Sequence, residues 1–261
     1  MERALLVAST FCFLIGFAYT MYSIGARNYR SSGFNFLAIL LGFIFQTVFL
    51  SVRGHAEGRC PLTSLFEVFI FLSWSVVLLY MLVGPAYRLS LMGVFTSPMV
   101  FVLQLFAMLA LNDVHTQGKI SPNPWVEMHA AVSVVAYGAF AVAGIASAMY
   151  LAQDRQLKTH QLGKFFFHLP PIANLAVAIN RLLLAGFILL TVGLITGFKV
   201  GFHGHQIFWG VGVWFIYGII LQAEKLKKLT PRRVAILSVL AFSLTLSTLW
   251  ALTFVSARGR F

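Results

Sequence analysis

The first residue with an evident chemical capacity is a histidine near the start of a long apolar segment. Residues 125–150 read WVEMHAAVSVVAYGAFAVAGIASAMY, in which His129, Ser133, Ala136 and Tyr137 recur at helical spacing and share one face. Most other positions are Ala, Gly, Ser or Val, so the helix either approaches its neighbours closely or leaves space for a flat cofactor. An imidazole is a competent axial ligand for haem iron. The alternative role is an interfacial hydrogen bond to lipid headgroups or to a neighbouring loop.

A second segment combines two histidines with several aromatic residues. Residues 196–222 read TGFKVGFHGHQIFWGVGVWFIYGIILQ, with His203 and His205 on either side of a glycine. Trp209 and Trp214 follow, about a turn and a half apart. Tryptophans at a membrane surface are ordinarily interface anchors, but the two glycines between these indoles indicate close approach of a flat group or of another backbone. The segment is therefore either an aromatic belt or a ligand surface.

A third segment carries a carboxylate inside an apolar run. Residues 58–74 read GRCPLTSLFEVFIFLSW, where Pro61 suits the start of a helix and Glu67 follows within it. An ionisable group within a membrane span is costly and indicates function by default. Near the end of a span, however, it can reach the headgroup region, so both interpretations of Glu67 stay open.

Composition indicates the elements that position these residues. Of 261 residues, 59% are hydrophobic and only 10% charged, and the mean hydropathy is +0.87. A water-soluble domain carries about a quarter charged residues, so we expect an integral membrane protein and exclude nucleic-acid binding, a Rossmann core and a disulfide scaffold. At roughly 20 residues per span, we expect eight helices in one transmembrane domain, residues 1–261. The expected helices are about 4–24, 34–52, 63–83, 89–111, 125–152, 175–198, 205–223 and 232–256.

Charge predicts the orientation of these helices. The net charge of +12 is typical of cytoplasmic loops that set topology. With both termini outside, twelve Lys and Arg lie inside and seven outside, and the inner excess is strongest at residues 224–233, EKLKKLTPRR. That orientation puts five of the seven histidines at the outer face, namely His55, His115, His129, His203 and His205.

The two cysteines exclude one class of chemistry. Cys12 lies in an apolar run and Cys60 in a loop, so we expect no disulfide between them. The sequence contains neither CxxC nor CxxCH, which disfavours a thiol oxidoreductase and covalently attached haem.

Three motifs together resemble the cytochrome c assembly superfamily, the CcsA, CcmC and CcmF type of haem-handling proteins. GRCPLTSLFEVFIFLSW is similar to the G-x-x-P-L-x-x-L-x-E-x-x-x-F-L-x-W pattern of the CcsA type. MHAAVSVVAYGAF, leading into SAMYLAQDRQLK, resembles the helix after the first outer histidine of the superfamily. LPPIANLAVAINRLLLAGFILLTVGLITG is similar to the helix before its tryptophan-rich motif. The resemblance covers residues 58–256.

The differences point to a particular branch of that superfamily. The tryptophan-rich motif has the form W-G-x-x-W-x-W-D, whereas this sequence reads WGVGVWFIYG and lacks the acidic residue. The second outer histidine, expected after the next helix pair, is absent before the terminal ARGRF. The chain is most similar to the shorter eight-helix HemX and YpjD-like proteins, some of which have a histidine where this sequence has Gln46.

We expect an all-α, polytopic transmembrane helix bundle, with about eight spans from the apolar runs and both termini outside from the Lys and Arg count, and the resemblance implies that it lies in a bacterial inner membrane. The resemblance also implies haem as cofactor, with His129 as an axial ligand of the iron. His205 or His203 is the candidate second ligand, and Trp209, Trp214 and Phe208 are the candidate apolar and stacking surface. Implied partners are membrane lipid, other cytochrome c assembly proteins and apocytochrome c, with no nucleic acid.

Two alternatives differ from this assignment. The protein expected from the resemblance holds haem and hands it on, as an assembly factor rather than a stand-alone enzyme, and the covalent step needs the CxxCH of a separate apocytochrome. The first alternative is a HemX-type regulator of haem biosynthesis without haem transfer. The second, a small transporter, is disfavoured because the spans hold few charges and lack paired broken helices.

Overall fold

The computed structural model describes residues 2–25, 33–62, 64–86, 92–109, 123–159, 170–199 and 205–258. Within these residues it contains eight helices and no strand. The helices are α1 (Glu2–Gly25), α2 (Gly33–Glu57), α3 (Leu65–Ala86), α4 (Met92–Leu109), α5 (Pro124–Lys158), α6 (Ile172–Lys199), α7 (His205–Lys225) and α8 (Pro231–Arg258).

The eight expected helices and the all-α class are confirmed. The largest differences are at the ends of α2 and α5, which continue past their apolar runs to Glu57 and Lys158. Apolarity underestimates these ends because charged side chains there can extend to water while the backbone remains helical.

The chain is a multi-pass membrane protein. Among the described residues, five helices are long and apolar enough to cross a membrane: α1, α2, α3, α5 and α6. The described apolar part of α4 is shorter, Phe95–Leu109. Large apolar side chains are exposed along the bundle, among them Phe11, Leu184 and Leu240. Exposed apolar surface of this extent is suited to lipid rather than to water.

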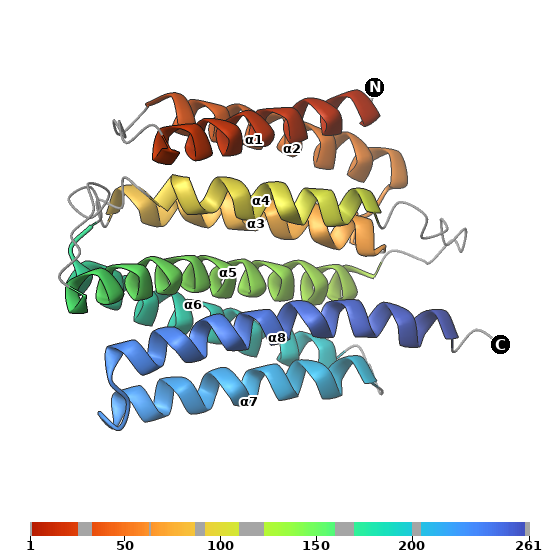
Figure 1. The fold of residues 1–261 in the computed structure, drawn as a ribbon. Helices are drawn as coiled ribbons and strands as arrows, with labels where there is room; N and C mark the ends of the chain where they lie inside the picture. The colour runs from red at the N-terminus through yellow and green to blue at the C-terminus, as the bar shows by residue number, and fades with distance from the viewer. Residues whose placement is uncertain are drawn as a thin grey trace.

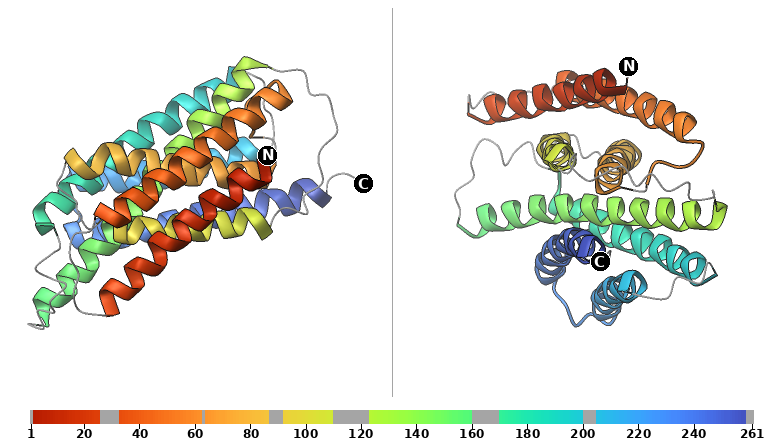
Figure 2. Two further views of the ribbon diagram at one scale, coloured as in Figure 1. Left: turned by 90° about the horizontal axis from the view of Figure 1, so that it is seen from above. Right: turned by 90° about the vertical axis from the view of Figure 1, so that its right-hand side faces the viewer.

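The helices are arranged in layers, with α5 near the centre (Figure 1). The pair α1 and α2 lies on α3 and α4, and α5 contacts α3 on one side and α6 and α8 on the other. The remaining helix, α7, contacts α6 and α8. Figure 2 shows that α1, α2, α5 and α6 share one tilt, whereas α3, α4, α7 and α8 share another.

The helices run between two ends of the bundle, each named here by one of its residues. The starts of α1, α3, α5 and α7 and the ends of the other four helices lie at one end, here called the Glu2 end. The opposite end, called the Lys158 end, holds the end of α5 and the start of α8. The start of α1 and the end of α8 thus lie on the same side, as the sequence predicts for the termini. Which side faces the cytoplasm stays a prediction.

Candidate functional site

His129 lies in the second turn of α5, at the Glu2 end, and is half-buried against α6. Its Nδ1 is 2.6 Å from the carbonyl oxygen of Gly193. Because a carbonyl can only accept a hydrogen bond, Nδ1 carries the proton and the lone pair of the neutral ring lies on Nε2. Metal-binding histidines have this arrangement, in which one ring nitrogen donates to a fixed acceptor and the other ligates.

A row of glycines on α6 positions this part of α5. A Cβ on Gly197 would lie 2.8 Å from both Cε1 and Nδ1 of His129, and a Cβ on Gly193 would lie 2.5 Å from Oγ of Ser133. The backbone of α6 can therefore approach α5 only because these positions lack side chains. Of the two possibilities that the small residues left open, close helix approach is the one realised along this face.

Deeper in the bundle, another glycine of α6 faces an aromatic ring of α5 in the same way. A Cβ on Gly186 would lie 2.5 Å from Cε1 of Phe140. The spacing from Gly186 to Gly193 is seven residues, as is that from Phe140 back to Ser133, so all these contacts belong to one antiparallel alignment of α5 and α6. The Phe140 ring also stacks on Tyr217 of α7, with centroids 3.6 Å apart and planes 5° apart.

Two of the predicted aromatic site residues lie on the surface. Phe208 and Trp209, in the first turns of α7, are 73% and 38% exposed and form an edge-to-face pair with centroids 6.2 Å apart. Gly210 faces α6, where an added Cβ would lie 3.2 Å from Cδ2 of Leu194. The start of α7 therefore contacts the same turn of α6 that accepts the His129 hydrogen bond.

Trp214 has different surroundings from these two residues. Its Nε1 donates to Oγ1 of Thr191 over 2.9 Å, and its ring stacks on Phe187 with centroids 5.1 Å apart. Both partners belong to α6, so Trp214 joins α7 to α6 and does not share the exposed surface of Phe208 and Trp209. The side chain of His205 and the whole of His203 lie outside the described residues.

A lysine lies close to the start of α5. Nζ of Lys199, the last residue of α6, is 5.1 Å from the centroid of the Trp125 ring. Among the described residues, no three His, Cys, Asp or Glu side chains converge to hold a metal ion. A metal bound at His129 by these residues would therefore have to bring ligands of its own, as haem iron does with its porphyrin. The donor chemistry at His129 fits that group.

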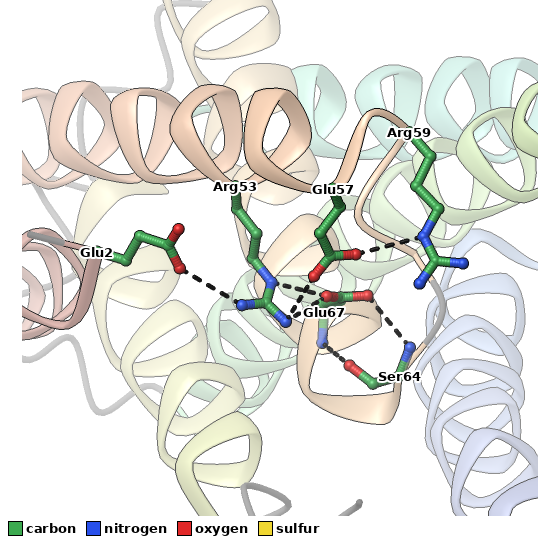
Figure 3. Close-up of polar contacts among 6 residues, drawn as sticks. All are labelled: Glu2, Arg53, Glu57, Arg59, Ser64 and Glu67. Atoms are coloured by element: carbon green, nitrogen blue, oxygen red, sulfur yellow. Dashed lines mark hydrogen bonds and ion pairs between the residues drawn. The ribbon is translucent and has the colours of Figure 1, made fainter. Parts of the chain in front are cut away.

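Glu67 belongs to a charge network at the Glu2 end (Figure 3). Its side chain is 1% exposed, and its Oε1 accepts from Nε and Nη2 of Arg53, each over 2.7 Å. Arg53 also contacts Glu57 at 3.1 Å and Glu2 at 3.5 Å. One guanidinium thus joins α1, α2 and α3.

Glu67 also completes the start of α3. Oε2 of Glu67 accepts the backbone N–H of Ser64 over 3.3 Å, while Oγ of Ser64 accepts the backbone N–H of Glu67 over 3.2 Å. This reciprocal pair is a capping box. Of the two interpretations left open for Glu67, these contacts favour a structural role, because they join α3 to α2 and cap the start of α3.

Sequence reasoning missed the partners of Glu67. From the sequence, Arg53 was only one of the outer positive charges, and Glu2 and Glu57 were given no role. Two local signals were available: Ser64 and Glu67 have capping-box spacing, and Arg53 and Glu57 have the i,i+4 spacing of a helical ion pair. The contact between Arg53 and Glu67 connects two helices and has no such local signature.

Gln46 lies in the interior of the bundle, where it joins α2 to α3. Its side chain is fully buried, and Nε2 donates to the carbonyl oxygen of Ile70 over 2.8 Å and also contacts Oγ of Ser73. Gln46 is therefore a helix-pairing residue in this chain.

Residues 62–256 match the protein family described as cytochrome C assembly protein. This chain belongs to that family. The match spans α3 to α8 and includes His129, Glu67 and Trp209, whereas α1 and α2 precede it. The resemblance inferred from the three motifs is thus confirmed.

Individual relatives of this cytochrome c assembly family protein carry two different names. The cytochrome c biogenesis protein CcsA of Guillardia theta is 25% identical over 233 residues, which cover 78% of this chain and 76% of that protein. CcsA of Synechococcus sp. strain CC9902 is 25% identical over 236 residues, with 78% of each chain covered. Protein HemX of Brevibacillus brevis is 26% identical over 172 residues, which cover 66% of this chain and 62% of HemX.

Proposed function

We propose that this protein binds haem at the Glu2 end and acts in cytochrome c biogenesis, at the outer face of a bacterial inner membrane. The observation that carries the proposal is the hydrogen bond from Nδ1 of His129 to Gly193, which leaves Nε2 as the basic nitrogen. Membership in the family and the likeness to CcsA proteins support the same role.

In this proposal each residue has a positional task. His129 is the protein ligand of the iron, and its bond to a backbone carbonyl orients the ring and increases its basicity. Phe208 and Trp209 offer exposed rings to the porphyrin face, and Lys199, beside Trp125, is a cation for an acidic substituent. Bound haem supplies the redox-active iron. The protein holds the group and hands it on to apocytochrome c, together with other assembly proteins.

Haem content tests the role of His129. The full-length protein, purified in mild detergent from haem-replete cells, should show a Soret band that His129→Ala reduces or shifts without lowering expression. His55→Ala is the matched control, because its Nδ1 also faces a backbone carbonyl, that of Ser51 at 2.9 Å, while its side chain is exposed on α2. A wild-type protein that is colourless and takes up no added haem would contradict the proposal, as would equal loss in both variants.

A second comparison tests whether the iron has a second protein ligand. His205 is expected at the same face as His129, whereas His168 is expected on the opposite side of the membrane. Loss of a low-spin spectrum in His205→Ala but not in His168→Ala supports bis-histidine ligation. Retention in both variants leaves His129 as the sole protein ligand.

The alternative is a HemX-type membrane regulator of haem biosynthesis that transfers no haem. The relative named HemX, from Brevibacillus brevis, favours this class. A protein without haem whose deletion changes the abundance of a haem-synthesis enzyme, with cytochrome c levels unaltered, fits this alternative. Loss of holocytochrome c on deletion, restored by the wild type but not by His129→Ala, fits the proposed role.

A further inference from the structure

A basic cleft lies at the Lys158 end, on the opposite side of the membrane from the candidate haem site. It has a volume of about 470 Å³ and is lined by α5, α8 and the turn before α8. Its basic side chains are Lys158, Arg232 and Arg233, and Tyr150 and Ile236 supply less polar walls. Neither the family assignment nor the proposed function uses these residues.

One carboxylate holds the two sides of the cleft together. Oδ2 of Asp154 lies 2.9 Å from Nζ of Lys158 and 3.4 Å from Nε of Arg232. Asp154 is mostly buried, with a side-chain exposure of 16%, whereas Lys158 and Arg232 are 55% and 56% exposed. The carboxylate thus fixes two cations that remain accessible.

The charges at the cleft do not balance. Among the described residues, Asp154 supplies one negative charge against the three cations that line the cleft, which leaves an excess of two positive charges. Arg233 forms no ion pair with any residue in the described part of the chain. Arginine forks and lysine ammonium groups are both common ligands of phosphate.

The surface beside the cleft favours a lipid as the source of that phosphate. Arg232, Ile236, Leu240 and Leu244 follow each other at intervals of four residues, so they form one stripe along α8. The three apolar members are 38%, 60% and 48% exposed. A charged group at the helix end, continued by an exposed apolar stripe, matches a phospholipid that has its phosphate in the cleft and an acyl chain along α8.

We infer that the cleft formed by Lys158, Arg232 and Arg233 is a binding site for the headgroup of an anionic phospholipid. Asp154 aligns the cations, and the bound lipid joins the end of α5 to the start of α8. Basic pockets between membrane helices are a known form of headgroup site. The site is separate from His129, so it can be tested whether or not the protein binds haem.

Native mass spectrometry of the detergent-solubilised full-length protein tests the site. Phosphatidylglycerol, cardiolipin and phosphatidylcholine are added in turn, and the bound lipid is counted. The wild type should retain one of the two anionic lipids but not phosphatidylcholine. Each basic residue near an anionic headgroup contributes about 1 kcal/mol, and 1.4 kcal/mol is tenfold in affinity. Arg232→Gln with Arg233→Gln should therefore weaken binding about 30-fold.

The chain offers a matched control for charge. Lys225→Gln with Lys228→Gln removes the same charge from the adjacent turn, but neither residue lines the cleft. This pair should bind anionic lipid nearly as the wild type does. Arg232→Lys with Arg233→Lys keeps the charge and should keep most of the binding, which guards against a fold defect in the glutamine pair. Gel filtration and the unfolding midpoint confirm that each variant is folded.

Several results would overturn the inference. Equal losses in the two glutamine pairs would show that attraction is general rather than local. Retention of phosphatidylcholine as strong as that of phosphatidylglycerol would exclude a charge-selective site. Displacement of the lipid by millimolar inorganic phosphate would make free phosphate the ligand, and binding of an acidic peptide in place of lipid would make the cleft a protein-docking surface.

Discussion

Arg53 and Glu67 form an ion pair between α2 and α3 in which the carboxylate is 1% exposed and the guanidinium group lies 2.7 Å away. Removing the buried carboxylate would leave Arg53 with only its more exposed partners, Glu57 and Glu2, so its loss should cost more stability than the loss of either of them. We therefore expect Glu67→Gln to lower the thermal unfolding midpoint of the detergent-solubilised protein markedly.

Glu57→Gln is the matched control for that substitution. Glu57 contacts the same guanidinium but is 24% exposed, so water replaces part of the interaction and the loss should be about 1 kcal/mol or less. Equal midpoints for the two variants would contradict the structural role assigned to Glu67.

Gly197→Ala should disturb His129 directly. The added Cβ would lie 2.8 Å from two atoms of the imidazole, so the ring must move or α6 must retreat. Overpacking of this kind costs about 1–3 kcal/mol, and it should shift the Soret band if His129 ligates haem. Gly212→Ala places a Cβ in open space, so it should neither lower the unfolding midpoint nor shift the Soret band. A spectral shift in Gly212→Ala alone would contradict the assigned geometry.

The two tryptophans of α7 should separate stability from haem retention. Trp214→Phe removes the hydrogen bond to Thr191 and should cost about 1 kcal/mol of stability, with a small effect on haem. Trp209→Phe changes an exposed ring and should leave the unfolding midpoint unaltered while weakening haem retention. Unchanged haem content in both variants would reduce Phe208 and Trp209 to an interface belt.

Cys60, in the turn between α2 and α3, should react slowly with maleimide at neutral pH. Burial, followed by the carboxylates of Glu127 and Glu67, raises the pKa of its thiol because each disfavours the negatively charged thiolate. The thiolate is the reacting form, so in a Cys12→Ser background the labelling rate should rise only above the ordinary pKa of a thiol. Glu127→Gln should shift that rise to lower pH. If the labelling rate of the Cys12→Ser protein rose at or below the ordinary pKa of a thiol, Cys60 would not lie in the buried, acidic surroundings described here.

Orientation can be tested with reporter fusions. The twelve-to-seven division of Lys and Arg predicts cytoplasmic loops at 153–174 and 224–231 and an outer loop at 112–124. A phosphatase fused at 112–124 should be active outside, and one fused at 224–231 should be inactive. An outer location for 224–231 would place His129 on the cytoplasmic side and contradict the proposed haem site at the outer face.

The existence of the helices and most of their ends could be predicted because apolar runs of membrane length are a local property of the sequence, whereas the charged ends of α2 and α5 could not. Local spacing also identified the small-residue face of the helix at 125–150 that contains His129. It could not identify the partner of that face: the contacts of Gly193 and Gly197 with α5 are tertiary, and so is the tautomer of His129. The separation of Trp214 from Trp209 was missed for the same reason, since both lie in one aromatic segment and differ only in what α6 presents to them.

The aligned contacts of α5 and α6 restrict the motions that this protein can make. Sliding α6 along α5 by even one residue, about 1.5 Å, would move Phe140, Ser133 and His129 out of register with Gly186, Gly193 and Gly197 at the same time. A piston-like stroke between the two helices is therefore blocked, and the height of the His129 imidazole along the bundle axis is fixed. A movement that does not slide these helices past each other, in this pair or in the elements around it, is needed to admit or release a molecule at His129.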